Sequence, residues 1–230
     1  MSYSKRAFSV LSVPVWFFVA SAAAWSAGQG PPQATTASQE AVLPPVKAPP
    51  SFAKGYEGYR AGRVDEAIAA LARAVEEEPR HALSFHFLAR AYLQKKRAAD
   101  AEEAAKRATA LAPKYARGWR ALGLAQLARD NPTSAAQSFA KAATLEPQDF
   151  WNQNNLGYAL LQAGRHEEAR KALERAVKID PSKAMTWNTL GVARLRAGDR
   201  PGAVEAFKKA LEIDPHHSLA RSNLARRELR

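Results

Sequence analysis

A proline recurs every 34 residues along most of this chain, and this period constrains the fold more than any other feature. The prolines are Pro79, Pro113, Pro147, Pro181 and Pro215. Two series of alanines keep the same register, namely Ala67, Ala101, Ala135, Ala169 and Ala203, and Ala74, Ala108, Ala142, Ala176 and Ala210. A fixed period of this length predicts a solenoid, in which each repeat is one supersecondary unit that buries its apolar face against its neighbours.

Each repeat contains two helix-length segments. In the last repeat, "MTWNTLGVARLRA" is followed by "GD" and then by "RPGAVEAFKKALEI". Apolar residues recur there at spacings of three and four, which predicts two helices that each bury one stripe. The repeated proline is expected to end the second helix. A glycine ends the first helix in three copies, and Lys96 and Asp130 take its place in the other two.

Two segments carry a resemblance to a known family: "WRALGLAQLARDNPTSAAQSFAKAATLEP" (119–147) and "WNTLGVARLRAGDRPGAVEAFKKALEIDP" (187–215). They closely resemble the tetratricopeptide repeat family. The resemblance implies an all-α fold, a right-handed α-solenoid of about five helix–turn–helix repeats with a C-terminal capping helix. The domain is expected over residues 51–230, with repeats at about 48–81, 82–115, 116–149, 150–183 and 184–217 and the cap at 218–230.

Some individual residues have expected places in this array. Trp119 and Trp187 are expected in the core, and Leu219 and Leu224 of the cap are expected to face the last repeat. Gln153 stands where two other repeats have tryptophan, so the first helix of the fourth repeat is expected to pack slightly differently.

The first 50 residues follow a different pattern. Residues 1–27 begin with "MSYSKR", continue as an apolar, uncharged run and end in small residues, which is the layout of a signal peptide or of an N-terminal membrane anchor. In either case Lys5 and Arg6 are expected to stay in the cytoplasm, so that the remainder is exported and is either periplasmic or anchored in the inner membrane with the repeat domain outside the cytoplasm. Residues 28–50 are rich in proline and alanine and predict a flexible-to-extended linker.

The charge of the chain is strongly basic, and this favours an anionic partner. There are 34 lysines and arginines against 22 aspartates and glutamates, and only Lys5, Arg6, Lys47 and Glu40 of these lie before residue 51. No nucleic-acid-binding motif is present, so nucleic acid is not expected as a partner. Opposite charges at helical spacing in the repeats also predict an ordinary solvated face for most of them.

The sequence contains no motif for catalysis, a metal or a cofactor. There is no cysteine, and "HEEAR" (166–170) lacks the second histidine of a zinc-binding helix. The chain is therefore expected to be no enzyme and to need no cofactor. A substrate-recruiting subunit of an envelope enzyme or assembly system is the alternative to a scaffold, and a weaker third hypothesis is a basic binder of membrane or glycan surfaces.

The resemblance also implies a binding surface, because first helices in this family line a concave groove that holds peptides. Carried onto this chain, the groove residues that we expect to bind a partner are His86, Arg90, Arg117, Arg120, Trp151, Asn154, Tyr158 and Asn188. Amides can bond a peptide backbone, arginines can bind carboxylates, and aromatic rings offer flat contact. The expected partner is thus a protein or an extended peptide, with acidic character favoured, in a scaffold or adaptor of the cell envelope.

Overall fold

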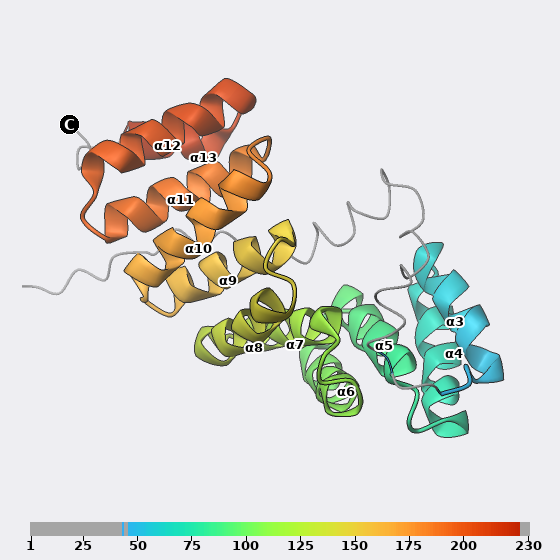
Figure 1. Cartoon of the computed structure of the whole chain (residues 1–230). Helices are drawn as coiled ribbons and strands as arrows, with labels where there is room; N and C mark the ends of the chain where they lie inside the picture. Colours follow the sequence, from blue (N-terminus) through green and yellow to red (C-terminus); the bar gives the residue numbers. More distant parts are fainter. Residues whose placement is uncertain (1–42, 44–45, 226–230) are drawn as a thin grey trace, which may run out of the picture.

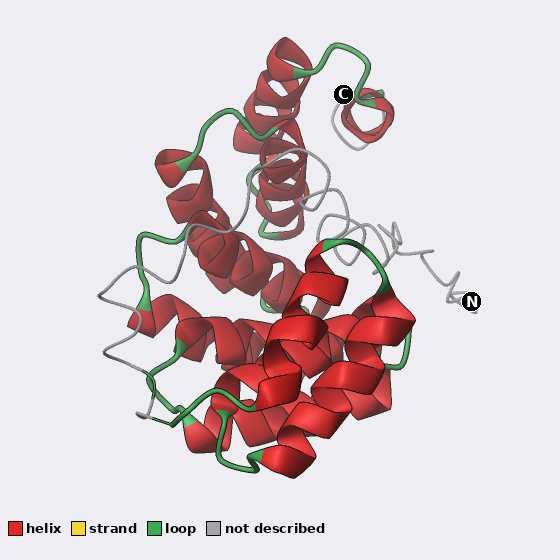
Figure 2. Ribbon diagram, turned by 90° about the vertical axis from the view of Figure 1, so that its right-hand side faces the viewer, coloured by secondary structure: helices red, strands yellow, loops and turns green. Residues whose placement is uncertain are grey.

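The structure is a computed structural model, and it describes residue 43 and residues 46–225. Within that part of the chain all regular structure is helical, and no strand is present (Figure 2). The helices are α3 (Pro50–Arg60), α4 (Val64–Glu77), α5 (Ala82–Gln94), α6 (Ala98–Leu111), α7 (Ala116–Ala128), α8 (Pro132–Leu145), α9 (Phe150–Gln162), α10 (His166–Ile179), α11 (Ala184–Arg196), α12 (Arg200–Ile213) and α13 (Ser218–Leu224).

The helices form an α-solenoid in which neighbours in sequence are neighbours in space (Figure 1). The odd-numbered helices α3 to α11 are the first helices of the five repeats, and the even-numbered helices α4 to α12 are the second helices. Each first helix packs against the second helix of its own repeat and, from α5 onward, of the preceding repeat. The expected number and order of helices are therefore confirmed, with α13 as a short capping helix.

The turn inside every repeat depends on one backbone conformation. The residue that ends this turn has a positive φ in all five copies: Gly62 (73°), Lys96 (60°), Asp130 (57°), Gly164 (76°) and Gly198 (91°). A left-handed residue directly after a helix lets the next amide bond back to a free carbonyl of the last turn. The Arg165 amide does this, donating to the Leu160 carbonyl at 2.9 Å. The positions expected to end the first helices are confirmed.

Small residues set the distance between the two helices of a repeat. A Cβ atom added at Gly123 would lie 2.7 Å from the Phe139 ring, and one added at Gly191 would lie 2.5 Å from the Phe207 ring. Both rings are fully buried. The second repeat differs, because Ala89 and Ala105 occupy the corresponding places and both are fully buried in one cluster. A glycine therefore pairs with a large side chain, whereas an alanine pairs with an alanine.

In the third, fourth and fifth repeats and in the cap, the fourth residue of the helix that follows the repeated proline is hydrogen-bonded to that proline. Four side chains donate a hydrogen bond to the carbonyl of the proline six residues earlier: Trp119 to Pro113 (2.8 Å), Gln153 to Pro147 (3.1 Å), Trp187 to Pro181 (2.8 Å) and Arg221 to Pro215 (2.7 Å). The two tryptophans are half-buried, not core residues as expected, because their indole N–H reaches the turn. Gln153 keeps the same bond as the tryptophans.

The cap contacts the last repeat through small and polar side chains. Ala220 is fully buried and Asn223 is 2% exposed, whereas Leu219 and Leu224 are only half-buried. The two leucines expected to face the last repeat are thus next to the buried positions of α13 in the sequence but keep part of their surface exposed. The His217 ring accepts the Ala220 amide at 3.2 Å and caps this short helix.

Candidate partner-binding surface

All eight residues expected to bind a partner lie on first helices, but the structure divides them into two groups. Four of them are buried, with at most 3% of their surface exposed: His86, Asn154, Tyr158 and Asn188. The other four are half-buried and reach the surface: Arg90, Arg117, Arg120 and Trp151. Only the second group presents side chains that a ligand can touch in this conformation.

The buried amides join consecutive first helices. The Thr186 hydroxyl on α11 donates to the Asn154 Oδ1 on α9 at 3.0 Å. The Asn223 Nδ2 on α13 donates to the Asn188 Oδ1 on α11 at 3.0 Å. These oxygens were expected to accept from a peptide backbone, but they already accept bonds inside the array. Sequence reasoning missed Thr186. The signal that could have found it is its position, because Thr186 and Asn152 are both the third residue of a first helix and both bond to the preceding first helix.

Arg120 is occupied in a similar way. Its guanidinium donates to the Asp149 Oδ1 at 2.9 Å and to the Asn152 Oδ1 at 3.0 Å, across the boundary between the third and fourth repeats. Its side chain is 16% exposed. Asp149 also accepts the Asn152 amide at 2.9 Å and so caps α9. Arg120 therefore already binds a carboxylate that belongs to the chain itself.

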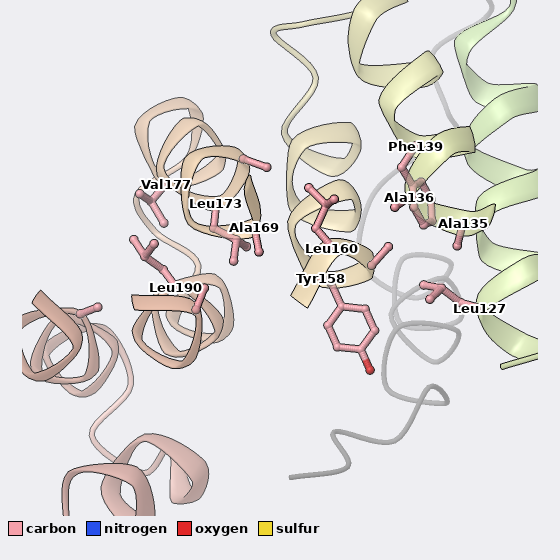
Figure 3. Packing of buried hydrophobic residues seen from close by; sticks show 14 residues of the cluster. Leu127, Ala135, Ala136, Phe139, Tyr158, Leu160, Ala169, Leu173, Val177 and Leu190 are labelled. Atoms are coloured by element: carbon pink, nitrogen blue, oxygen red, sulfur yellow. The ribbon is translucent and has the colours of Figure 1, made fainter. Parts of the chain in front are cut away.

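The two aromatic residues differ in their surroundings. Tyr158 belongs to the buried cluster that also contains Leu127, Phe139, Leu160 and Leu173 (Figure 3). Burial raises the pKa of its hydroxyl. Trp151 is half-buried, and its ring meets the Phe150 ring edge-on with centroids 5.1 Å apart. Trp151 thus keeps accessible apolar area that could contact a partner.

Three arginines converge on one part of the first helices, and we call Arg90, Arg117 and Arg120 the cationic cluster. Between α5 and α7 lies the buried His86 ring, edge-on to the Tyr115 ring at 5.3 Å. Burial first, and then the charges of all three arginines, hold the pKa of His86 well below its ordinary value of 6.5. The same three charges oppose the rise that burial causes in the pKa of Tyr115. The buried pair thus experiences a positive field.

The members of the cationic cluster differ in what they bind. Arg120 is paired with Asp149, and the Arg90 guanidinium lies 5.0 Å above the Tyr59 ring. Arg117 is half-buried and forms no hydrogen bond or ion pair with the residues that the structure describes. A guanidinium in a positive region can bind a carboxylate with two parallel hydrogen bonds. Arg117 is therefore the member of the cluster best suited to an acidic ligand.

Clusters of metal ligands and membrane-spanning helices are both absent from the described part of the chain. Residue 43 and residues 46–225 contain no group of three or more histidine or acidic side chains that could hold a metal ion. In the same residues no helix has both the length and the apolar character needed to cross a membrane. The segment expected to be a signal peptide or anchor lies outside the described residues.

The comparisons with solved structures give the same fold. YrrB, described as a TPR protein with an unusual peptide-binding site, is 21% identical with a TM-score of 0.69, over 77% of this chain and 91% of YrrB. A MamA structure is 26% identical with a TM-score of 0.65, over 72% of this chain and 90% of MamA. TTC0263, a thermophilic TPR protein of Thermus thermophilus, is 23% identical with a TM-score of 0.56, over 76% of this chain and 95% of TTC0263.

The family comparison agrees with the repeat pattern. No curated protein matches the sequence significantly. Two family models described as tetratricopeptide repeat match residues 59–125 and 154–218, which together are more than half of the 230 residues. With five helix pairs in one solenoid and a 34-residue period, the chain belongs to the tetratricopeptide repeat family, whose fold serves as a scaffold for protein interaction.

Proposed function

We propose that this scaffold binds an extended peptide with an acidic side chain across the exposed parts of α5 and α7. The observation that carries the proposal is the cationic cluster, in which Arg117 lacks a carboxylate partner among the described residues while two further arginines stand close by. Trp151 would extend the contact toward α9 with an apolar ring. The peptide-binding site named in the YrrB description supports peptide binding by this fold, without identifying the ligand here.

The amide residues have a different role in this proposal. Asn154 and Asn188 hold adjacent first helices at a fixed spacing, so they position the surface instead of binding the peptide. This divides the eight residues into those that contact the ligand and those that keep the array in register.

A selection from a random peptide library tests the proposal without knowledge of the natural partner. The full chain is expected to enrich peptides with aspartate or glutamate, and their affinity is expected to fall by about tenfold between low and high salt, because salt screens exposed charges. Enrichment of peptides without acidic residues would refute the acidic ligand. If unrelated polyanions bind as well as the selected peptides and lose affinity with salt to the same extent, the result would instead favour diffuse attachment to the basic surface.

We also propose that the chain acts in the cell envelope. The basis is the sequence of residues 1–27, where Lys5 and Arg6 precede an uncharged apolar run. A fusion of residues 1–50 to a reporter that is active only outside the cytoplasm is expected to give activity. Reversal of both charges, Lys5→Glu with Arg6→Glu, is expected to lower it, because the positive side of such a segment stays in the cytoplasm. Retention of the unaltered fusion in the cytoplasm would exclude export.

A further inference from the structure

We propose that the chain's own linker is an intramolecular ligand, with Leu43 occupying an apolar site that the second repeat forms next to its boundary with the third. The site consists of buried Ala82, Ala112 and Tyr115 together with half-buried Leu83 and Leu111, and Leu43 packs against this cluster. The buried members are at most 3% exposed. Leu43 lies outside the helices, so its place in the cluster depends on the linker folding back onto the array.

The residues after Leu43 connect this site to the start of the solenoid. Val46 is half-buried and Pro49 is buried, and the Pro49 carbonyl accepts the Phe52 amide at 3.0 Å at the start of α3. Six residues lie between Leu43 and Pro50, and the seven steps of chain from one to the other can span at most about 25 Å. The linker therefore contacts the array at two places, at the start of α3 through Pro49 and at the second repeat through Leu43. Lys47 and Ala48 between these contacts are exposed.

Prolines reduce the cost of this docking. Positions 44, 45, 49 and 50 are all proline, in the stretch "LPPVKAPP" (43–50). Proline restricts the conformations of the free chain, so less entropy is lost when the segment is held in place. A tethered ligand also acts at an effective concentration in the millimolar range, which allows a site for one leucine to be filled.

The occupied site adjoins the cationic cluster. Tyr115 contributes to the site and also contacts the His86 ring, and Arg117 follows it by two residues on α7. A partner peptide that reaches Arg117 along this end of α5 and α7 meets Leu43 and has to displace it. This consequence for the partner rests on the proposed function, whereas the docking of Leu43 does not.

Cross-linking tests the docking itself, because the chain contains no cysteine. The full chain with Leu43→Cys and Leu83→Cys is expected to form an internal link with a short thiol-reactive cross-linker, with both thiols consumed in a monomer. The matched control, Leu43→Cys with Leu195→Cys on α11, is expected to stay unlinked. A linked dimer would assign the site to the linker of a second copy, and equal linking in the two variants would overturn the proposal.

A peptide in trans tests whether the site is a ligand site. The probe is the synthetic peptide "QEAVLPPVKAPP" (39–50), added to the full chain, to Leu43→Asp and to Lys47→Gln. Leu43→Asp is expected to bind the peptide at least tenfold more tightly than the other two, because its own linker no longer competes. Lys47→Gln changes the net charge by the same amount at an exposed residue. Equal affinity of all three chains would overturn the proposal, and it would leave the acidic-ligand test at Arg117 unaffected.

Discussion

At the turns of this array, the backbone conformation is the same whatever the residue type. The five positive-φ residues show this, because three are glycine while Lys96 and Asp130 adopt the same conformation with a side chain. A non-glycine residue in this region costs roughly 1 kcal/mol or more, and aspartate tolerates it better than lysine. Lys96 is therefore the turn residue whose type fits its conformation least well.

The first prediction exchanges this lysine. Lys96→Gly is expected to raise the free energy of unfolding by about 1 kcal/mol, because glycine adopts a positive φ without steric cost. The same exchange in the middle of a helix, Lys141→Gly on α8, is expected to lower it by about 1 kcal/mol. Urea denaturation followed by circular dichroism measures both. A destabilised Lys96→Gly variant would show that contacts of the lysine side chain outweigh the backbone term.

The second prediction concerns pH and the buried His86. Its pKa in the folded protein lies well below the ordinary value of 6.5 that applies when the chain is unfolded. Between these two values the unfolded chain binds more protons, so stability falls as the pH drops below about 6.5. His86→Phe keeps a ring beside Tyr115 and is expected to flatten this dependence between pH 5 and 6.5, in thermal melts over that range. Part of the slope is expected to remain, since burial also lowers the pKa of His81.

At the scale of helices, the repeated pattern predicted the helices and their turns, but it did not predict the contacts between repeats. The 34-residue period and the small residues led directly to five helix pairs and to their turns. The contacts of Thr186, Asn152 and Tyr115 were not predicted, because each of them is made to a neighbouring helix. One sequence does not show which side chains of neighbouring helices meet. The same limit explains why Asn154 and Asn188 were placed in the ligand surface.

The third prediction uses the alternative packing that the chain itself contains. Gly123→Ala is expected to cost about 1–3 kcal/mol by overpacking against Phe139, and Phe139→Ala about 3–5 kcal/mol by leaving a cavity. The double variant recreates the Ala89–Ala105 pair of the second repeat. Its free energy of unfolding is expected to be at least 1 kcal/mol higher than the value obtained by adding the two single losses. Purely additive effects in urea denaturation would mean that the two helices do not adjust their separation.

At the scale of the whole molecule, the array positions a cationic surface, and beside it Leu43 packs against the cluster that contains Tyr115. The sequence predicted a solenoid with net positive charge, but not which arginines are already paired. Arg120 is paired with Asp149, the residue that caps the first helix of the next repeat, whereas Arg117 is not paired within the described residues. The contact of Leu43 also escaped prediction, because a proline-rich segment without periodicity gives no sign of where it folds back.

The most direct test of the account is the affinity of a selected acidic peptide for three full-length chains: the unaltered protein, Arg117→Ala and Arg175→Ala. Arg175 is an exposed arginine on α10, a second helix, so both variants lose the same charge. Isothermal titration calorimetry is expected to show a loss of about 1–3 kcal/mol, or roughly 5- to 150-fold, for Arg117→Ala and almost none for Arg175→Ala. Thermal melts should show both variants equally folded. Equal losses in the two variants would contradict the account, because the partner would then respond to net charge and not to this surface.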